Sequence, residues 1–159
     1  MLKALIAGIG LIAFAHLAVG DDRGKLVGVW KLVSWESEFQ DGSGRRPVMG
    51  KATGYLILTA EGRMMAVLEA EGRKPAQTDE QRAALWRTTV GYTGIYRVEG
   101  DKWITTVDVS WNPAWHGSEQ VRFFKLEGDR LQVSTDWGRH PTLPGGPTTR
   151  GVLMWERTK

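Results

Sequence analysis

The sequence predicts an all-β protein, a closed antiparallel up-and-down β-barrel of about eight strands with one short helix. Short runs rich in β-branched and aromatic residues recur along the chain, and turns centred on glycine separate them. Glycine is frequent, at 20 of 159 residues, which is typical of a chain with many tight turns. Most links between the runs have hairpin length, so sequential strands are expected to be antiparallel neighbours. Closing the sheet into a barrel would remove its unpaired edges.

Eight runs have strand character, and each ends at a turn or a proline. Asp41-Gly42-Ser43-Gly44 follows the first run, and Glu61-Gly62 separates the second from the third, as in a hairpin. Asn112-Pro113 stops the fifth run, because proline cannot donate to a strand ladder. The predicted strands are 26–36, 54–59, 64–68, 92–98, 103–111, 120–126, 131–135 and 151–157.

One segment has a helical signature. Thr78 and Gln81 have the spacing of a capping box, in which each side chain accepts a hydrogen bond from the other's backbone N–H. Ala83, Ala84, Leu85 and Trp86 follow, so the sequence predicts a helix near 79–89.

The first twenty residues are expected to be a secretory signal peptide. Lys3 precedes an apolar stretch from Ala4 to Val19, and the small residues Ala18 and Gly20 come just before Asp21-Asp22. The stretch is shorter than the roughly 20 apolar residues of a spanning helix, although an uncleaved membrane anchor is the alternative. Cleavage after Gly20 would leave one domain, residues 21–159, with no membrane span, in the periplasm or secreted.

Composition excludes several classes of protein and site. The 21 basic residues exceed the 18 acidic ones only slightly and form no clustered stripe, which argues against nucleic-acid binding. The chain has no cysteine, so it has no disulfide, thiolate metal site or cysteine nucleophile. Neither a phosphate-binding loop nor a dinucleotide fingerprint is present, and no cofactor is expected. His116 and Glu119 alone are too few ligands to predict a metal site.

Several segments resemble the bacterial and fungal lipocalin-like domain. The segment Asn112-Pro113-Ala114-Trp115, followed by Arg122, is the most specific of them, and the resemblance covers about residues 25–157. It implies a small antiparallel β-barrel around an apolar cavity. Many members carry a histidine on the strand before the Asn-Pro turn, where this chain has Thr105-Thr106, so no role for such a histidine is expected here. The matching segments are 26–34, 54–56, 61–64, 92–96, 109–122, 126–131 and 155–157.

Gly28-x-Trp30 also resembles the signature of true lipocalins. In those proteins a late arginine stacks on the tryptophan at the closed end of the barrel, and Arg157 is the candidate partner in this chain. Such a pair is expected to close the barrel structurally and to bind no ligand.

Strand alternation suggests which side chains face the interior. Alternation places Trp103, Val107, Val109 and Trp111 on one face of their strand and Asp108 on the other. An inward Arg122 would have to pair with Asp108, Asp136 or a ligand acid. The candidate cavity walls are Tyr55, Met65, Tyr92, Trp103, Trp111, Trp115 and Phe124, with Arg122 and Asp108 as orienting polar groups.

The resemblance and these side chains predict a protein that binds a small hydrophobic molecule in its barrel cavity. The alternative is an isomerase or cyclase, in which Asp108 or His116 serves as an acid or base inside the same cavity. Ser110 or Ser134 with His116 and either Asp108 or Asp136 could also form a catalytic triad, although no nucleophile-elbow motif supports it. A third possibility is a purely structural protein whose tryptophans fill the interior.

Overall fold

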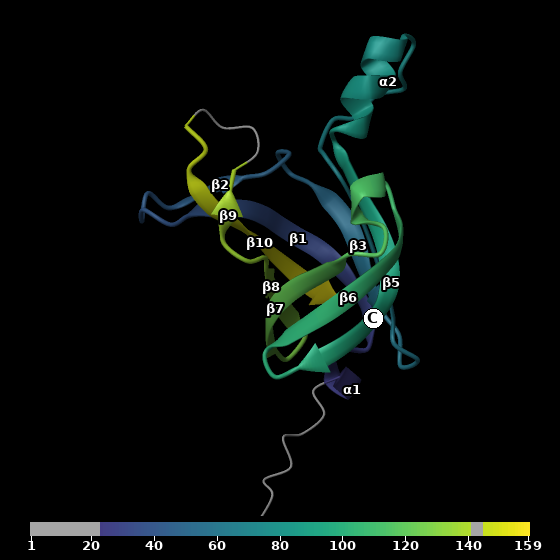
Figure 1. Ribbon diagram of the computed structural model, residues 1–159, viewed down its shortest axis with the longest axis vertical. Coiled ribbons are helices and arrows are strands. Elements are labelled where there is room, and N and C mark those ends of the chain that lie inside the picture. The colour runs from purple at the N-terminus through teal and green to yellow at the C-terminus, as the bar shows by residue number, and fades with distance from the viewer. Residues whose placement is uncertain (1–22, 141–144) are drawn as a thin grey trace, which may run out of the picture.

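The computed structural model describes residues 23–140 and 145–159 and shows a closed antiparallel barrel of eight strands (Figure 1). The strands follow one another around the barrel in chain order, and the last pairs with the first, so the sheet has no open edge in the barrel wall. The predicted fold class is therefore confirmed. The barrel strands are β1 (Gly28–Phe39), β3 (Thr53–Leu58), β4 (Arg63–Glu69), β5 (Thr89–Glu99), β6 (Lys102–Ser110), β7 (Glu119–Glu127), β8 (Arg130–Ser134) and β10 (Thr148–Arg157).

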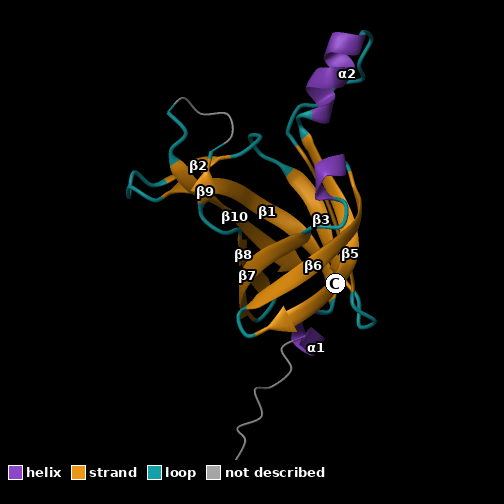
Figure 2. Ribbon diagram, viewed as in Figure 1, coloured by secondary structure: helices purple, strands orange, loops and turns teal. Residues whose placement is uncertain are grey.

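Two additional short strands and two single helical turns accompany the barrel strands. Strand β2 (Arg45–Pro47) pairs with β1, and β9 (Gly138–Arg139) pairs with β10. The turn α1 (Arg23–Leu26) lies at one end of the barrel, and η1 (Pro113–Trp115) lies at the end that also carries α2, β2 and β9 (Figure 2). The two additional strands were not predicted, since neither is longer than three residues.

Helix α2 (Asp79–Trp86) has the predicted capping box. The Gln81 backbone N–H donates to Thr78 Oγ1 at 3.3 Å, and the Thr78 backbone N–H donates to Gln81 Oε1 at 3.2 Å. The helix ends earlier than predicted, because β5 begins at Thr89. None of its residues is buried, and it stands away from the barrel at one end (Figure 1). Local capping rather than tertiary packing therefore defines this helix.

The end of the barrel that carries α1 is closed by Trp30 and Arg157. Trp30 is fully buried, its indole N–H donates to Leu26 O at 2.9 Å, and the Arg157 guanidinium lies 4.0 Å from the centre of its ring. Arg157 also donates to Val27 O and Lys25 O, each at 2.7 Å. The predicted stacking of Arg157 on Trp30 is confirmed.

A bulge in β6 corrects the predicted alternation of that strand. Thr93 on β5 pairs with Val109, but the next residue, Gly94, pairs with Val107, so Asp108 is an extra residue in β6. The alternation is therefore interrupted, and Val109 is 61% exposed whereas Val107 is buried. The prediction that Val109 shares the inner face with Trp103 is wrong for this reason.

Residues 1–20, the expected signal peptide, lie outside the described residues. In the part of the chain that the structure describes, no helix has both the length and the apolar character needed to cross a bilayer.

Candidate ligand-binding cavity

The barrel encloses a cavity of about 640 Å³. Its walls include inward side chains from the middle of the barrel, such as Leu56, Met64 and Trp155, and loop residues from the end that carries α2. Five of the eight tryptophans line it, so these indoles surround the space instead of filling it. A mainly apolar cavity of this size is typical of small-molecule sites. The five are Trp35, Trp103, Trp111, Trp115 and Trp155.

The Asn-Pro segment gathers one aromatic wall. Asn112 Oδ1 accepts a hydrogen bond from the Ala114 N–H at 3.1 Å and caps η1. This turn brings Trp115 edge-on to Trp111, with ring centres 4.8 Å apart, and edge-on to Tyr92, with ring centres 5.2 Å apart. The structure thus places five of the predicted residues in the cavity lining: Tyr92, Trp103, Trp111, Trp115 and Arg122.

Tyr55 and Met65 do not line the cavity, and their prediction as walls is wrong. Both point outward and are 48% and 43% exposed. Their neighbours Leu56 and Met64 are buried and line the cavity instead. A strand alternates strictly, so choosing the wrong one of two adjacent apolar residues places the prediction on the opposite face.

Phe124 also lies outside the cavity lining. Its ring stacks on Trp103, with ring centres 5.8 Å apart and planes at 28°, and packs against the core cluster. Phe124 therefore faces the core, but it does not form part of the cavity wall, contrary to the prediction.

The two acid/base candidates do not line the cavity either. Asp108 lies at the bulge on the outer face and forms an ion pair with Arg63. It therefore cannot pair with Arg122 or act inside the barrel as placed, and its prediction as an orienting group is wrong. His116 is exposed, and its Nε2 lies 3.2 Å from the Ser110 backbone nitrogen.

No predicted serine triad is assembled. Ser110 Oγ accepts a hydrogen bond from the Asn112 N–H, and His116 contacts the backbone of Ser110, so the base does not reach the nucleophile. Ser134 is buried in β8 and does not line the cavity. Across residues 23–140 and 145–159, no group of three or more His, Asp or Glu side chains is placed to hold a metal ion.

A comparison with known protein families agrees with the barrel fold. A family model described as the lipocalin-like domain matches residues 27–158, which is nearly all of the described chain. The chain belongs to the lipocalin-like domain family.

One curated protein and one solved structure are similar to this lipocalin-like chain. It is 31% identical over 88 residues to the 4'-hydroxy-3'-methoxypropiophenone carrier protein of Aspergillus oryzae, an alignment that covers 50% of this chain and 77% of that protein. The crystal structure of an uncharacterized protein from Bacteroides eggerthii aligns with 14% identity and a TM-score of 0.42, over 83% of this chain and 98% of that one.

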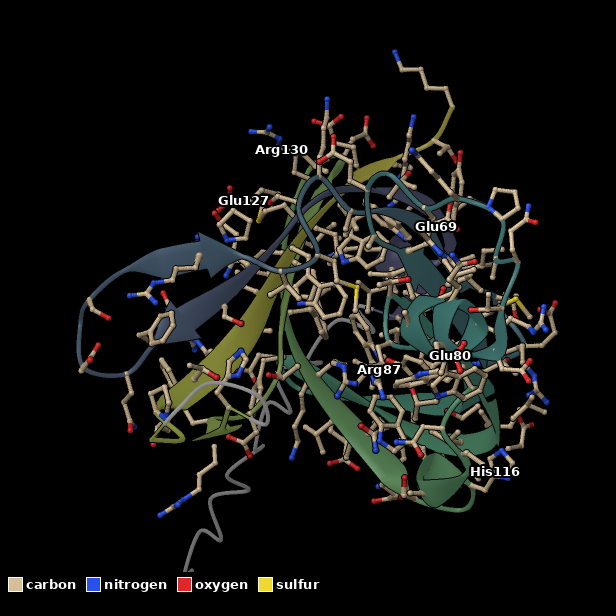
Figure 3. All side chains as sticks on the ribbon, turned by 90° about the horizontal axis from the view of Figure 1, so that it is seen from above. Glu69, Glu80, Arg87, His116, Glu127 and Arg130 are labelled. Carbon is tan, nitrogen blue, oxygen red and sulfur yellow. The ribbon has the colours of Figure 1, made fainter. Side chains whose placement is uncertain are left out.

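The cavity of this lipocalin-like barrel has a positively charged mouth that was not predicted. Four arginines line the cavity against a single carboxylate, that of Asp136. In the view from above, Arg87 lies over the middle of the molecule and His116 lies at its edge (Figure 3). These arginines lie on four separate segments of the chain, so no sequence pattern could have grouped them. The four arginines are Arg87, Arg122, Arg139 and Arg150.

One of these arginines already has a carboxylate partner within the protein. Arg150 Nε donates to Glu38 Oε2, and Arg45 donates to the other oxygen of the same carboxylate at 2.9 Å. Hydrogen bonds from Arg45 and Arg150 lower the pKa of Glu38 below its usual value of 4.5, against a smaller opposing effect of burial. Glu38 therefore stays ionised at neutral pH, and the Arg150 charge has a fixed partner.

Proposed function

We propose that this lipocalin-like protein binds and carries a small hydrophobic molecule in its barrel cavity. The single observation that carries the proposal is the mainly apolar cavity of about 640 Å³, which aromatic side chains line without filling. Drug-sized ligands occupy cavities of this volume and character in other proteins. The relative from Aspergillus oryzae is named as a carrier of a methoxylated phenolic ketone, which supports a small aromatic ligand for this chain as well.

Binding is favoured over catalysis by the placement of the candidate groups. An isomerase or cyclase would need an acid or base that faces its substrate. The two residues considered for that role, Asp108 and His116, lie outside the cavity lining. No observation on these residues therefore favours the enzymatic alternative.

Filling the cavity is expected to abolish binding of a neutral apolar probe. Ala66 is buried and lines the cavity, so Ala66→Trp would place an indole in the ligand space. We expect the wild type to bind one N-phenyl-1-naphthylamine per chain, followed by its fluorescence. Steric overlap in a packed site costs about 1–3 kcal/mol, so Ala66→Trp should weaken this binding about tenfold or more.

The neighbouring residue supplies a matched control. Val67 points outward and is 51% exposed, so Val67→Trp adds the same side chain outside the barrel and should leave the affinity within about twofold, as surface changes usually do. Both variants are to be compared with the wild type by thermal unfolding. A folded Ala66→Trp that binds the probe like the wild type would show that the probe does not enter the cavity, and would contradict the proposal.

We also propose that the protein is exported, with residues 1–20 removed as a signal peptide. The apolar stretch after Lys3 and the small residues at 18 and 20 support this proposal. Protein isolated from its own cells is then expected to begin at Asp21, as intact-mass measurement would show. A mass that includes Met1 to Gly20 in the isolated protein would contradict cleavage.

A further inference from the structure

We propose that the cavity is selective for amphipathic anions, that is, molecules with an apolar body and one carboxylate-like acid group, and that Arg122 binds the acid group. The inference rests on the proposed function, because it assumes that a ligand enters the cavity, and it adds the chemical class of that ligand.

Arg122 is held in the cavity wall by neutral groups. It extends from β7, where it pairs with Trp103 of β6, and its side chain is half-buried. Its Nη1 donates to the Val121 carbonyl oxygen at 2.7 Å, and its Nη2 lies 3.4 Å from Gln120 Oε1. The guanidinium also lies 5.8 Å from the ring centre of Tyr92 and 5.9 Å from that of Trp115. These contacts orient the guanidinium group without neutralising its charge.

The charge of Arg122 has no carboxylate partner in the described residues. A guanidinium has five N–H donors, and the two hydrogen bonds above use only part of them. The two predicted partners are both elsewhere: Asp108 binds Arg63 on the outer face, and Asp136 lines the cavity but forms no ion pair with Arg122. A half-buried cation among aromatic rings is stabilised when an anion joins it, because each charge then offsets the desolvation of the other. A carboxylate also matches the planar fork in a bidentate arrangement.

The mouth of the cavity is positively charged, as Arg122 is. Arg87 and Arg139 line the cavity, and neither forms an ion pair with a carboxylate in the part of the chain that the structure describes. Arg150 pairs with Glu38, which it shares with Arg45, and Asp136 is the opposing charge in the lining. The balance remains positive, and clefts lined by one sign of charge attract ligands of the other sign. An anion would therefore be drawn to the cavity and bound there at Arg122.

Two fluorescent probes that share one aromatic body test the inference. 1-Anilinonaphthalene-8-sulfonate carries an anionic group that N-phenyl-1-naphthylamine lacks. We expect the wild type to bind the sulfonate more tightly than the neutral amine. Arg122→Met should weaken binding of the sulfonate roughly 10- to 100-fold, as expected for loss of a charge-assisted hydrogen-bonded pair. The same variant should change the affinity for the neutral amine less than about threefold, because it removes a charge and keeps an apolar stem.

Lys125 supplies the matched control for charge. It lies on the same strand, points outward and pairs with Glu127, so Lys125→Met removes one positive charge without touching the cavity. Its affinity for both probes should match that of the wild type. Arg122→Lys should bind the sulfonate more tightly than Arg122→Met and less tightly than the wild type, since it keeps the positive charge and loses the planar guanidinium.

A second measurement needs no variant. 4-Phenylbutyrate and 4-phenylbutanol share one skeleton and differ in the acid group, and each can displace N-phenyl-1-naphthylamine from the wild type at pH 7. The acid should displace the probe at a concentration about tenfold lower, as for a difference of one charge-assisted hydrogen bond. Equal displacement by acid and alcohol, or equal loss of both probes in Arg122→Met, would overturn the anion selectivity and leave the proposed carrier function standing. Failure of the wild type to bind the neutral probe would instead overturn the proposed function.

Discussion

Replacing Trp30 by alanine is expected to lower the free energy of unfolding by about 3–5 kcal/mol, the usual cost of deleting a fully buried large aromatic ring. The ring is fully buried, its N–H binds Leu26 O, and Arg157 stacks on its face. Its removal would leave a cavity at the closed end of the barrel and would take away the surface on which Arg157 rests. Since small domains are stable by about 5–15 kcal/mol, the loss is a large share of the total. Equilibrium unfolding in urea measures it.

Trp86 supplies a control for the same deletion. It ends helix α2, is 54% exposed, and belongs to an element with no buried residue, so Trp86→Ala should change the free energy of unfolding by less than about 0.5 kcal/mol. If Trp30→Ala yields no folded protein, Trp30→Phe removes only the indole N–H and part of the ring and should cost less. A loss below about 1 kcal/mol in Trp30→Ala would show that the closed end does not stabilise the barrel in the way described.

Adding a single methyl group at Gly94 is expected to cost about 3 kcal/mol, at the upper end of the range for overpacking. Gly94 is the β5 residue at the bulge, where Thr93 and Gly94 pair with Val109 and Val107. A Cβ atom at this position would lie 2.1 Å from the carbonyl oxygen of Thr106 and 2.9 Å from Thr105 Cγ2. The first neighbour is backbone and cannot rotate away, so Gly94→Ala must separate β5 from β6. Thermal and urea unfolding would measure the loss.

Gly91 supplies the control, because it lies on the same strand and a Cβ atom there would meet nothing within 4 Å. Gly91→Ala is expected to be neutral or slightly stabilising, since alanine restricts the unfolded chain more than glycine does. Similar stabilities of the two variants would contradict the steric explanation for glycine at position 94.

The sequence could predict the features that depend on local patterns. The eight strand runs, the turns between them and the capping box at Thr78 and Gln81 were all readable, because each depends on residues close together in the chain. The contact between Trp30 and Arg157 was predicted from the resemblance to lipocalins, although the two residues lie far apart in the chain. Neighbouring strands of an up-and-down barrel are also neighbours in sequence, apart from the closing pair of β1 and β10.

The candidate cavity was predictable only in part. The aromatic side chains around the Asn-Pro turn were found, because η1 gathers them locally. Tyr55 and Met65 were misplaced, because two adjacent apolar residues in a strand do not reveal which one faces inward. Asp108 lies on the face opposite Trp103, as strand alternation places it, so its assignment to the cavity was wrong; the bulge in β6 instead explains why Val109 is exposed.

By itself, the sequence determined that eight strands form the barrel, where they turn, and that one end is closed by Trp30 and Arg157. Only the tertiary structure decided which face each side chain takes and which charges meet. The face that a side chain takes depends on the register between strands, and the positive charge of the cavity depends on arginines from distant parts of the chain that barrel closure brings together. Arg122 shows both effects, since its residue type was visible in the sequence, whereas the lack of a carboxylate partner follows from where Asp108 and Asp136 come to lie.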